Sequence, residues 1–134
     1  MRPPSGIPTI DVAEAHRRLG DGADAVLVDV REPGEFAAVR IAGAALYPIS
    51  TFALRYADLP RDRPLLVMCA AGSRSLAATA HLLRNGWPDV VNVAGGIEAW
   101  QRAGLPVRTG PVAGGEGTLG TDGLRGTGGL PGNE

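Results

Sequence analysis

The sequence predicts an α/β fold: a central, mainly parallel sheet of about five strands with helices on both faces. Two observations lead to this prediction. Short apolar runs alternate along the chain with segments of helical periodicity, which is the pattern of repeated strand–helix–strand units. Two of the runs, 25–30 and 65–68, contain almost no polar residue, as expected of strands that are covered on both faces.

The first elements follow from local signals. Residues 7–10 are predicted to form a short strand, and Asp11 is placed to cap the helix that follows. Glu14, three residues later, completes a capping-box pattern. The helix is expected to end at Gly20 and to bury the face formed by Val12, Ala15 and Leu19.

The elements of the middle of the chain are shorter. After the strand at 25–30, Pro33 suits the first turn of a short helix that runs to Val39. Residues 44–47 are predicted to form a weak strand. Ser50 is a candidate N-cap for a helix through Tyr56, and a turn at 60–64 follows.

The last part of the domain repeats the alternation. The strand at 65–68 leads through a loop into a helix expected from Ser75 to Arg84, with Gly86 as its stop. One side of this helix carries Leu76, Ala80 and Leu83. A strand at 90–93 follows, and Gly95-Gly96 opens a final helix in which Trp100 is expected to pack in the core.

Length and charge narrow the possible functions. A chain of 134 residues is one domain by the usual length relation. The formal net charge of −1 gives no basic surface for nucleic acid or an anionic membrane. All 13 basic residues are arginine, so enzymes that need a lysine Schiff base are excluded.

The chain is predicted to be cytoplasmic. It has one cysteine and therefore no internal disulfide. It shows neither a signal-peptide pattern at its beginning nor an apolar run long enough to span a membrane.

Composition changes sharply after Arg108. Residues 109–134 contain ten glycines, two prolines and no aromatic residue, too little apolar area to offset the entropy of ordering. We therefore expect a folded domain over 7–108 and a flexible tail over 109–134.

The segment with the clearest chemical meaning is the loop from Cys69 to Ser75, between a buried strand and a helix. Ligands of open α/β sheets bind beyond the carboxyl ends of the strands, where Cys69 is placed. Small residues in the loop (Ala70, Ala71, Gly72 and Ser73) let the backbone curl and direct its N–H groups at one point. Such a pocket lowers the pKa of a thiol and favours the nucleophilic thiolate.

Arg74 adds positive charge to this loop and suits an anionic substrate. Cysteine phosphatases and arsenate reductases of the same loop type have five residues between the cysteine and the arginine, whereas this chain has four. The tighter loop favours a single sulfur atom over a phosphoryl group. A cysteine that is only a small buried apolar residue is the simpler interpretation, but its combination with glycine and arginine favours function.

Three motifs of this sequence resemble the signatures of one protein family. Val28–Glu32 followed by Glu35-Phe36, the loop Cys69–Ser75, and Gly95–Trp100 are similar, in order and spacing, to the signatures of the rhodanese homology domain. The resemblance extends from about Ile7 to Val107. One position departs from it, because Arg40 stands before Ile41-Ala42-Gly43 where the family usually has histidine.

The resemblance implies a single-domain sulfurtransferase without a cofactor, which moves sulfur from a donor such as thiosulfate to a thiol or to cyanide through a Cys69 persulfide. The expected partners are a small anionic donor and an external thiol or protein acceptor. A non-catalytic regulatory or docking module is the alternative. Mass measurement after mixing with thiosulfate distinguishes the two.

Other polar residues receive simpler interpretations. Asp29 and Arg31, at the end of a strand, are expected to support the site through ion pairs, with loop arginines as partners, and Glu35 is expected to pair likewise. His16 and His81 lie on different predicted helices and have no second ligand at metal-binding spacing.

Overall fold

The structure, a computed structural model, describes residues 6–20 and 24–119. Its centre is a five-stranded sheet in the order β1-β5-β4-β2-β3, in which every neighbouring pair is parallel. The strands are β1 (Thr9–Ile10), β2 (Val26–Asp29), β3 (Ala45–Leu46), β4 (Leu65–Met68) and β5 (Val90–Val93). This confirms the predicted fold class.

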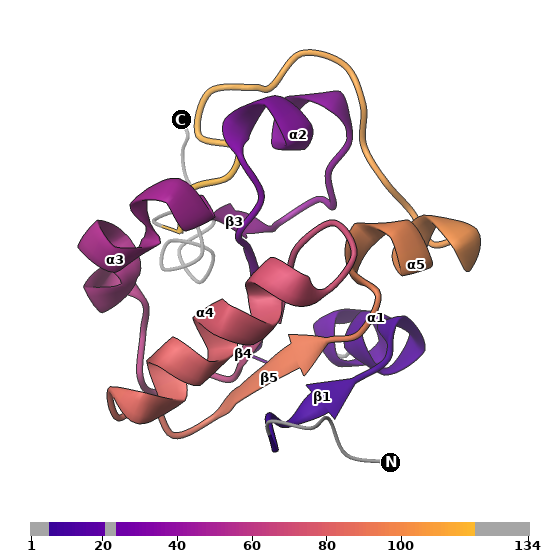
Figure 1. The fold of residues 1–134 in the computed structure, drawn as a ribbon. Coiled ribbons are helices and arrows are strands. Elements are labelled where there is room, and N and C mark those ends of the chain that lie inside the picture. The colour runs from indigo at the N-terminus through magenta and orange to yellow at the C-terminus, as the bar shows by residue number, and fades with distance from the viewer. Residues whose placement is uncertain (1–5, 21–23, 120–134) are drawn as a thin grey trace.

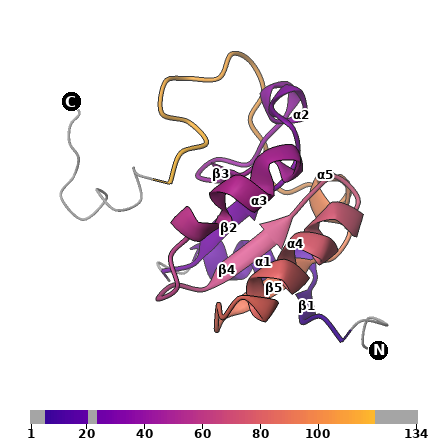
Figure 2. The ribbon, with the colours of Figure 1, turned by 60° about the vertical axis from the view of Figure 1, so that its left-hand side comes forward.

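Helices cover both faces of this sheet (Figures 1 and 2). The α-helices are α1 (Val12–Gly20), α2 (Pro33–Ala38), α3 (Phe52–Arg55), α4 (Ser73–Arg84) and α5 (Gly96–Arg102). Two short 3-10 helices, η1 (Ile49–Thr51) and η2 (Tyr56–Asp58), flank α3. One apolar cluster joins the sheet to α3 and α4, and a second joins the opposite face to α1, α2 and α5.

The middle of the sheet sets the position of the candidate site. β4 lies between β2 and β5, and Asp29 is in register with Met68. The carboxyl ends of β2 and β4 therefore meet at one edge, where β2 leads toward α2 and β4 leads into the loop before α4. All four residues of β2 and all four of β4 are buried, as predicted for strands covered on both faces.

Several local predictions need correction. Ser50 caps no helix; its hydroxyl and N–H donate to the Glu32 carboxylate instead. Helix α4 begins at Ser73, earlier than expected, and its fully buried residues are Ser75, Ala78, Thr79 and Leu82. The predicted face, with Leu76 and Leu83, is only half-buried. The helix is turned in this way because Ser75 points at the Cys69 sulfur.

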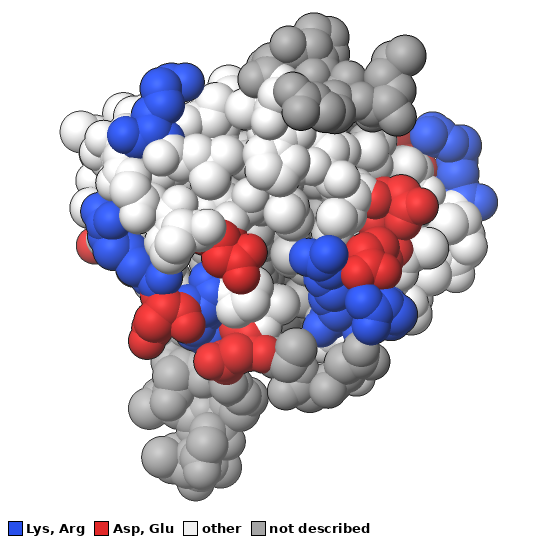
Figure 3. Space-filling model, turned by 90° about the horizontal axis from the view of Figure 1, so that it is seen from below, with Lys and Arg blue, Asp and Glu red and all other residues white. Residues whose placement is uncertain are grey.

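The Asp11 cap is present, because the Asp11 carboxylate accepts the Glu14 N–H at 2.9 Å. Glu14 itself pairs with Arg17 and Arg18 on the exposed side of α1. Figure 3 shows one face of the molecule, on which arginines and acidic side chains lie next to one another. Within 6–20 and 24–119, no helix has both the length and the apolar character needed to cross a bilayer.

The beginning of the segment expected to be a flexible tail is packed against the domain. Residues 109–119, here called the C-terminal strap, run back across the domain to β3, where the Leu46 N–H donates to the Gly117 carbonyl at 2.8 Å. Gly117 lies so close to Phe36 that a side chain at 117 would meet the ring at 3.2 Å. Leu119 packs against the cluster beneath α3 and α4. The rest of the expected tail, 120–134, lies outside the described residues.

Arg40 holds this strap. It is 1% exposed and forms two backbone hydrogen bonds with Arg108, at 2.9 and 2.7 Å. Its guanidinium pairs with Glu116 at 2.6 Å and donates to the carbonyls of Gly110 and Pro111. Composition could not reveal this, because much of the docking comes from one buried cation that pairs with Glu116 and with backbone carbonyls.

Candidate active site

Cys69 follows β4 directly and its sulfur is enclosed by the loop that it begins, here called the Cys69 loop (residues 69–75). The Gly72 N–H donates to Sγ at 3.1 Å and the Ser75 N–H at 3.4 Å. The Ser75 hydroxyl lies 3.4 Å from the same sulfur. Part of the predicted ring of amides is therefore present, with the sulfur at its centre.

Two glycines make this turn possible. Gly72 has φ of 118°, in the left-handed region that a side chain disfavours. Gly96 of α5 packs against the outside of the loop, where an added Cβ would lie 2.3 Å from the Cys69 carbonyl oxygen. The N–H groups of Ile97 and Glu98 donate to the carbonyls of Cys69 and Ala70, at 2.9 and 3.0 Å. The beginning of α5 thus holds these two carbonyls on the side away from the sulfur.

The environment of the sulfur favours the thiolate. Burial alone raises the pKa of Cys69, because it removes water from the charged form. The Ser75 hydroxyl and the backbone N–H groups of Ser75, Gly72 and Arg74 lower it. The result is a pKa of Cys69 below that of an ordinary thiol.

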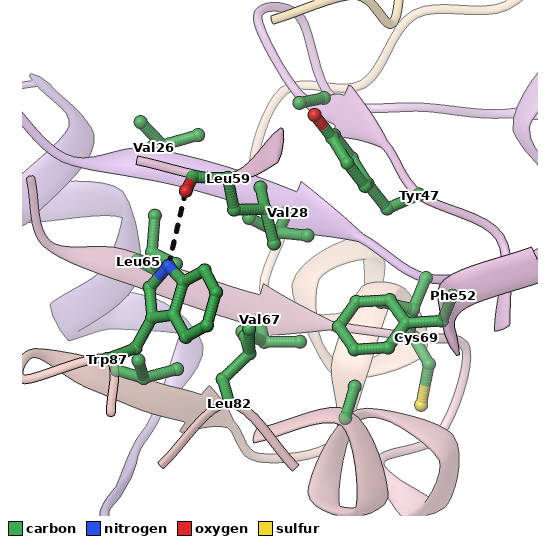
Figure 4. Close-up of a cluster of buried hydrophobic side chains, with 14 residues drawn as sticks. Val26, Val28, Tyr47, Phe52, Leu59, Leu65, Val67, Cys69, Leu82 and Trp87 are labelled. Atoms are coloured by element: carbon green, nitrogen blue, oxygen red, sulfur yellow. Dashed lines mark hydrogen bonds between the residues drawn. The ribbon is translucent and has the colours of Figure 1, made fainter. Parts of the chain in front are cut away.

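The sulfur is less accessible than a surface pocket would make it. Cys69 is 1% exposed and belongs to the apolar cluster beneath α3 and α4. Figure 4 shows it at one end of that cluster, with its sulfur directed away from the labelled apolar side chains. Cys69 therefore continues the core layer of Leu65 and Val67 along β4.

Arg74 does not point freely into the loop. Its guanidinium forms two hydrogen bonds with the Glu35 carboxylate, at 2.8 and 2.9 Å, and both side chains remain about one-third exposed. This contact lowers the pKa of Glu35 to about 2 and raises that of Arg74. The predicted pairing role of Glu35 is thus seen in the structure.

Asp29 and Arg31 form a buried ion pair with each other, at 2.8 Å, and not with arginines of the Cys69 loop. Arg31 also donates to the carbonyls of Glu35 and Val39, so the pair fixes the two ends of α2. The Asp29–Arg31 pair is therefore connected to the site through Glu35 of α2, which binds Arg74.

The other predicted site residues differ in their contacts. Ala70 contributes its carbonyl to α5 rather than an amide to the sulfur. Ala71 and Ser73 are exposed. His16 contacts Trp100, which is buried as predicted, and His81 lies against Tyr56. In the described part of the chain, no three His, Cys, Asp or Glu side chains form a group suited to a metal ion.

Sequence reasoning missed one residue next to the site. Asn92 of β5 is 3% exposed, and its Oδ1 accepts a 2.6 Å hydrogen bond from the Ser75 hydroxyl. A signal was available, because Asn92 is the single polar residue in the apolar run of β5. A polar side chain at a core position needs a buried partner.

Comparison with known proteins agrees with this geometry. The model of the Rhodanese-like domain matches residues 11–103. A sulfurtransferase of Allochromatium vinosum is 40% identical over 98 residues, which are 73% of this chain and 92% of that protein.

Solved structures give the same result. A rhodanese-related protein of Thermoplasma volcanium superposes with a TM-score of 0.70 and 35% identity, over 75% of this chain and 97% of the other. A thiosulfate sulfurtransferase of Pseudomonas aeruginosa superposes with a TM-score of 0.72 and 29% identity, over 79% of this chain and 21% of the other.

Proposed function

Because the chain belongs to the rhodanese-like domain family, we propose that it is a sulfurtransferase and that Cys69 carries the transferred sulfur as a persulfide. The observation that supports this most directly is the pair of backbone N–H groups that donate to one sulfur, from Gly72 at 3.1 Å and from Ser75 at 3.4 Å. Such donors stabilise a negative charge on sulfur in the way that an oxyanion hole stabilises oxygen.

The first half-reaction forms the persulfide. The Cys69 thiolate attacks the outer sulfur of a donor such as thiosulfate, and an S–S bond forms at Sγ. The S–S bond of the donor breaks, and sulfite leaves with its electron pair. Charge is conserved, because the persulfide carries one negative charge and sulfite two. The N–H groups of Gly72 and Ser75, which face Sγ, are placed to stabilise the charged product.

The second half-reaction returns the enzyme to its thiolate. Cyanide, or the thiolate of a small molecule or protein, attacks the terminal sulfur, and the Cys69 Sγ leaves with the electron pair of the S–S bond. The chain has no second cysteine, so the acceptor comes from outside. A donor has to reach the sulfur of a residue that is 1% exposed, so the reaction requires a local movement that opens access to Sγ.

That burial, with Arg74 already paired to Glu35, also favours a second candidate, a non-catalytic docking module. The two are distinguished by intact mass after the protein is mixed with thiosulfate. For the enzyme we expect a gain of one sulfur atom, which cyanide removes as thiocyanate. The matched control, Cys69→Ser, differs by one atom and gains nothing. A wild-type protein that stays unmodified with thiosulfate and with other sulfane donors would support the module.

A further inference from the structure

Asn92 occupies a position where the fold calls for an apolar residue. Along β5, Val91 and Val93 face the cluster of α1 and α5, whereas Val90 faces the cluster of α3 and α4. Alternation places Asn92 on the side of Val90, toward α4. A buried amide without a hydrogen-bond partner destabilises the fold, so the contacts of this side chain have to explain its presence.

The contact that Asn92 makes is with the residue that touches the sulfur. The Ser75 hydroxyl donates to Asn92 Oδ1 at 2.6 Å, and Ser75 is fully buried. The same oxygen lies 3.4 Å from Cys69 Sγ and 3.2 Å from the Gly72 carbonyl. A hydroxyl has one hydrogen and two acceptor lone pairs, so it cannot donate to Asn92 and to the sulfur at the same time.

The direction of this hydrogen has to change with the state of the sulfur. In the thiol state, the Cys69 S–H donates to Ser75 Oγ, and the Ser75 O–H donates to Asn92 Oδ1. A thiolate only accepts, so a hydrogen bond between Ser75 Oγ and Sγ then requires the Ser75 O–H to turn toward the sulfur. Asn92 then faces an oxygen that needs a donor, and an amide turned about its last bond supplies one from Nδ2.

We propose that Asn92 is a positioning residue that acts through Ser75, because its side chain can accept from the hydroxyl in the thiol state and donate to it in the thiolate and persulfide states. The inference rests on the proposed function, since it assigns the residue that adapts the loop to the sulfur's charge. An aspartate at this position could accept from the hydroxyl in the thiol state but could not donate to it in the thiolate and persulfide states. A leucine could do neither.

The charged groups near the sulfur are paired with one another and do not contact the Ser75 hydroxyl as Asn92 does. Arg74, on α4, interacts electrostatically with Cys69 but is paired with Glu35 of α2. Asp29, which ends β2, is paired with Arg31, which follows the strand. Ser75 is the side chain that reaches the sulfur, and Asn92 is its buried partner from β5.

The test is the pH dependence of Cys69 alkylation by iodoacetamide, which reports the thiolate without any sulfur donor. We expect Asn92→Asp to move the profile to higher pH and lower the rate at neutral pH roughly tenfold, about one pKa unit. Asn92→Leu is expected to shift it less, in the same direction. Thr79→Val is the control, because Thr79 is buried one turn further along α4 and its hydroxyl donates to the Ser75 carbonyl, not to the Ser75 hydroxyl or the sulfur. Its profile should match wild type.

The Ser75→Ala background decides whether Asn92 acts through the hydroxyl. There, Asn92→Leu should leave the alkylation profile unchanged. The proposal is overturned if Asn92→Leu matches wild type, or if its shift persists without the Ser75 hydroxyl; these two variants decide the matter even if Asn92→Asp does not fold. A protein that alkylates as expected but takes no sulfur from any donor would refute the proposed function and leave this inference standing.

Discussion

The Cys69 loop and the C-terminal strap each form an arginine–glutamate pair with another part of the domain, but the two pairs are built in different ways. In the loop, the sulfur contacts lie within six residues of Cys69, and the Arg74–Glu35 pair is about one-third exposed. In the strap, Arg40 is 1% exposed and its partner, Glu116, is 76 residues further along the chain.

The difference teaches where charge contributes to stability. An exposed ion pair contributes little, because water screens it and competes for its hydrogen bonds. A buried arginine that also satisfies backbone carbonyls cannot be removed without stranding those partners. The loop should therefore respond to substitution mainly in its chemistry, and the strap mainly in its stability.

The largest effect is expected where a side chain would push into the loop. Gly96→Ala places a Cβ 2.3 Å from the Cys69 carbonyl, so the loop has to move. We expect a loss of alkylation and sulfur-transfer rate of roughly 100-fold, as a displacement near 1 Å can produce. Gly104→Ala is the control, because Gly104 also has positive φ but open space around it. Equal losses in both variants would show that backbone strain, and not the contact with the loop, is responsible.

The second prediction compares the two arginines by stability. Arg40→Met leaves the carbonyls of Gly110 and Pro111 without their donor and should lower the free energy of unfolding by about 2 kcal/mol. Arg74→Met should lower it by less than about 1 kcal/mol. Urea denaturation followed by tryptophan fluorescence measures both. A larger loss for Arg74→Met would contradict the distinction between the regions.

The third prediction concerns substrate charge. Arg74→Ala should slow sulfur transfer from thiosulfate more than transfer from a neutral sulfane donor, by roughly fivefold to tenfold. The reason is that the anionic donor would lose a charge-assisted contact with the guanidinium. The effect stays modest because Glu35 already occupies the guanidinium. Rates for the two donors, with Arg84→Ala as an exposed control, give the comparison. Equal slowing of both donors would exclude a role in donor recognition.

The smallest effect is expected in the acid titration of the strap. The hydrogen bond from Arg40 lowers the pKa of Glu116 to about 2 from 4.5. Its contribution to strap docking is therefore complete above pH 4.5 and is lost as the pH falls toward 2. The Leu46 amide, which bonds to Gly117, should show this transition in its NMR chemical shift. Glu116→Gln should lack it, and the same transition in that variant would assign it to another group.

The two regions also differ in how far sequence alone could predict them. Cys69, Gly72 and Arg74 form one short motif, so local geometry was enough to predict that backbone N–H groups would surround the sulfur. Arg40 and Glu116 are distant in sequence, and the glycine-rich composition of the segment around Glu116 gave no sign that its carboxylate pairs with a buried arginine. The Asn92–Ser75 contact was also missed, because it depends on which way α4 turns over the sheet. The burial of Cys69 follows from alternation along β4, which places it in the same core layer as Leu65 and Val67.

The contacts of α5 with the loop have a consequence for synthesis. Cys69 leaves the ribosome well before Ile97 and Glu98, whose N–H groups fix the loop carbonyls. β5, which lies between β1 and β4, also arrives late. We therefore expect a nascent chain that has been made only as far as α4 to lack the contacts that hold the Cys69 and Ala70 carbonyls, so the loop takes its final form only after α5 has emerged.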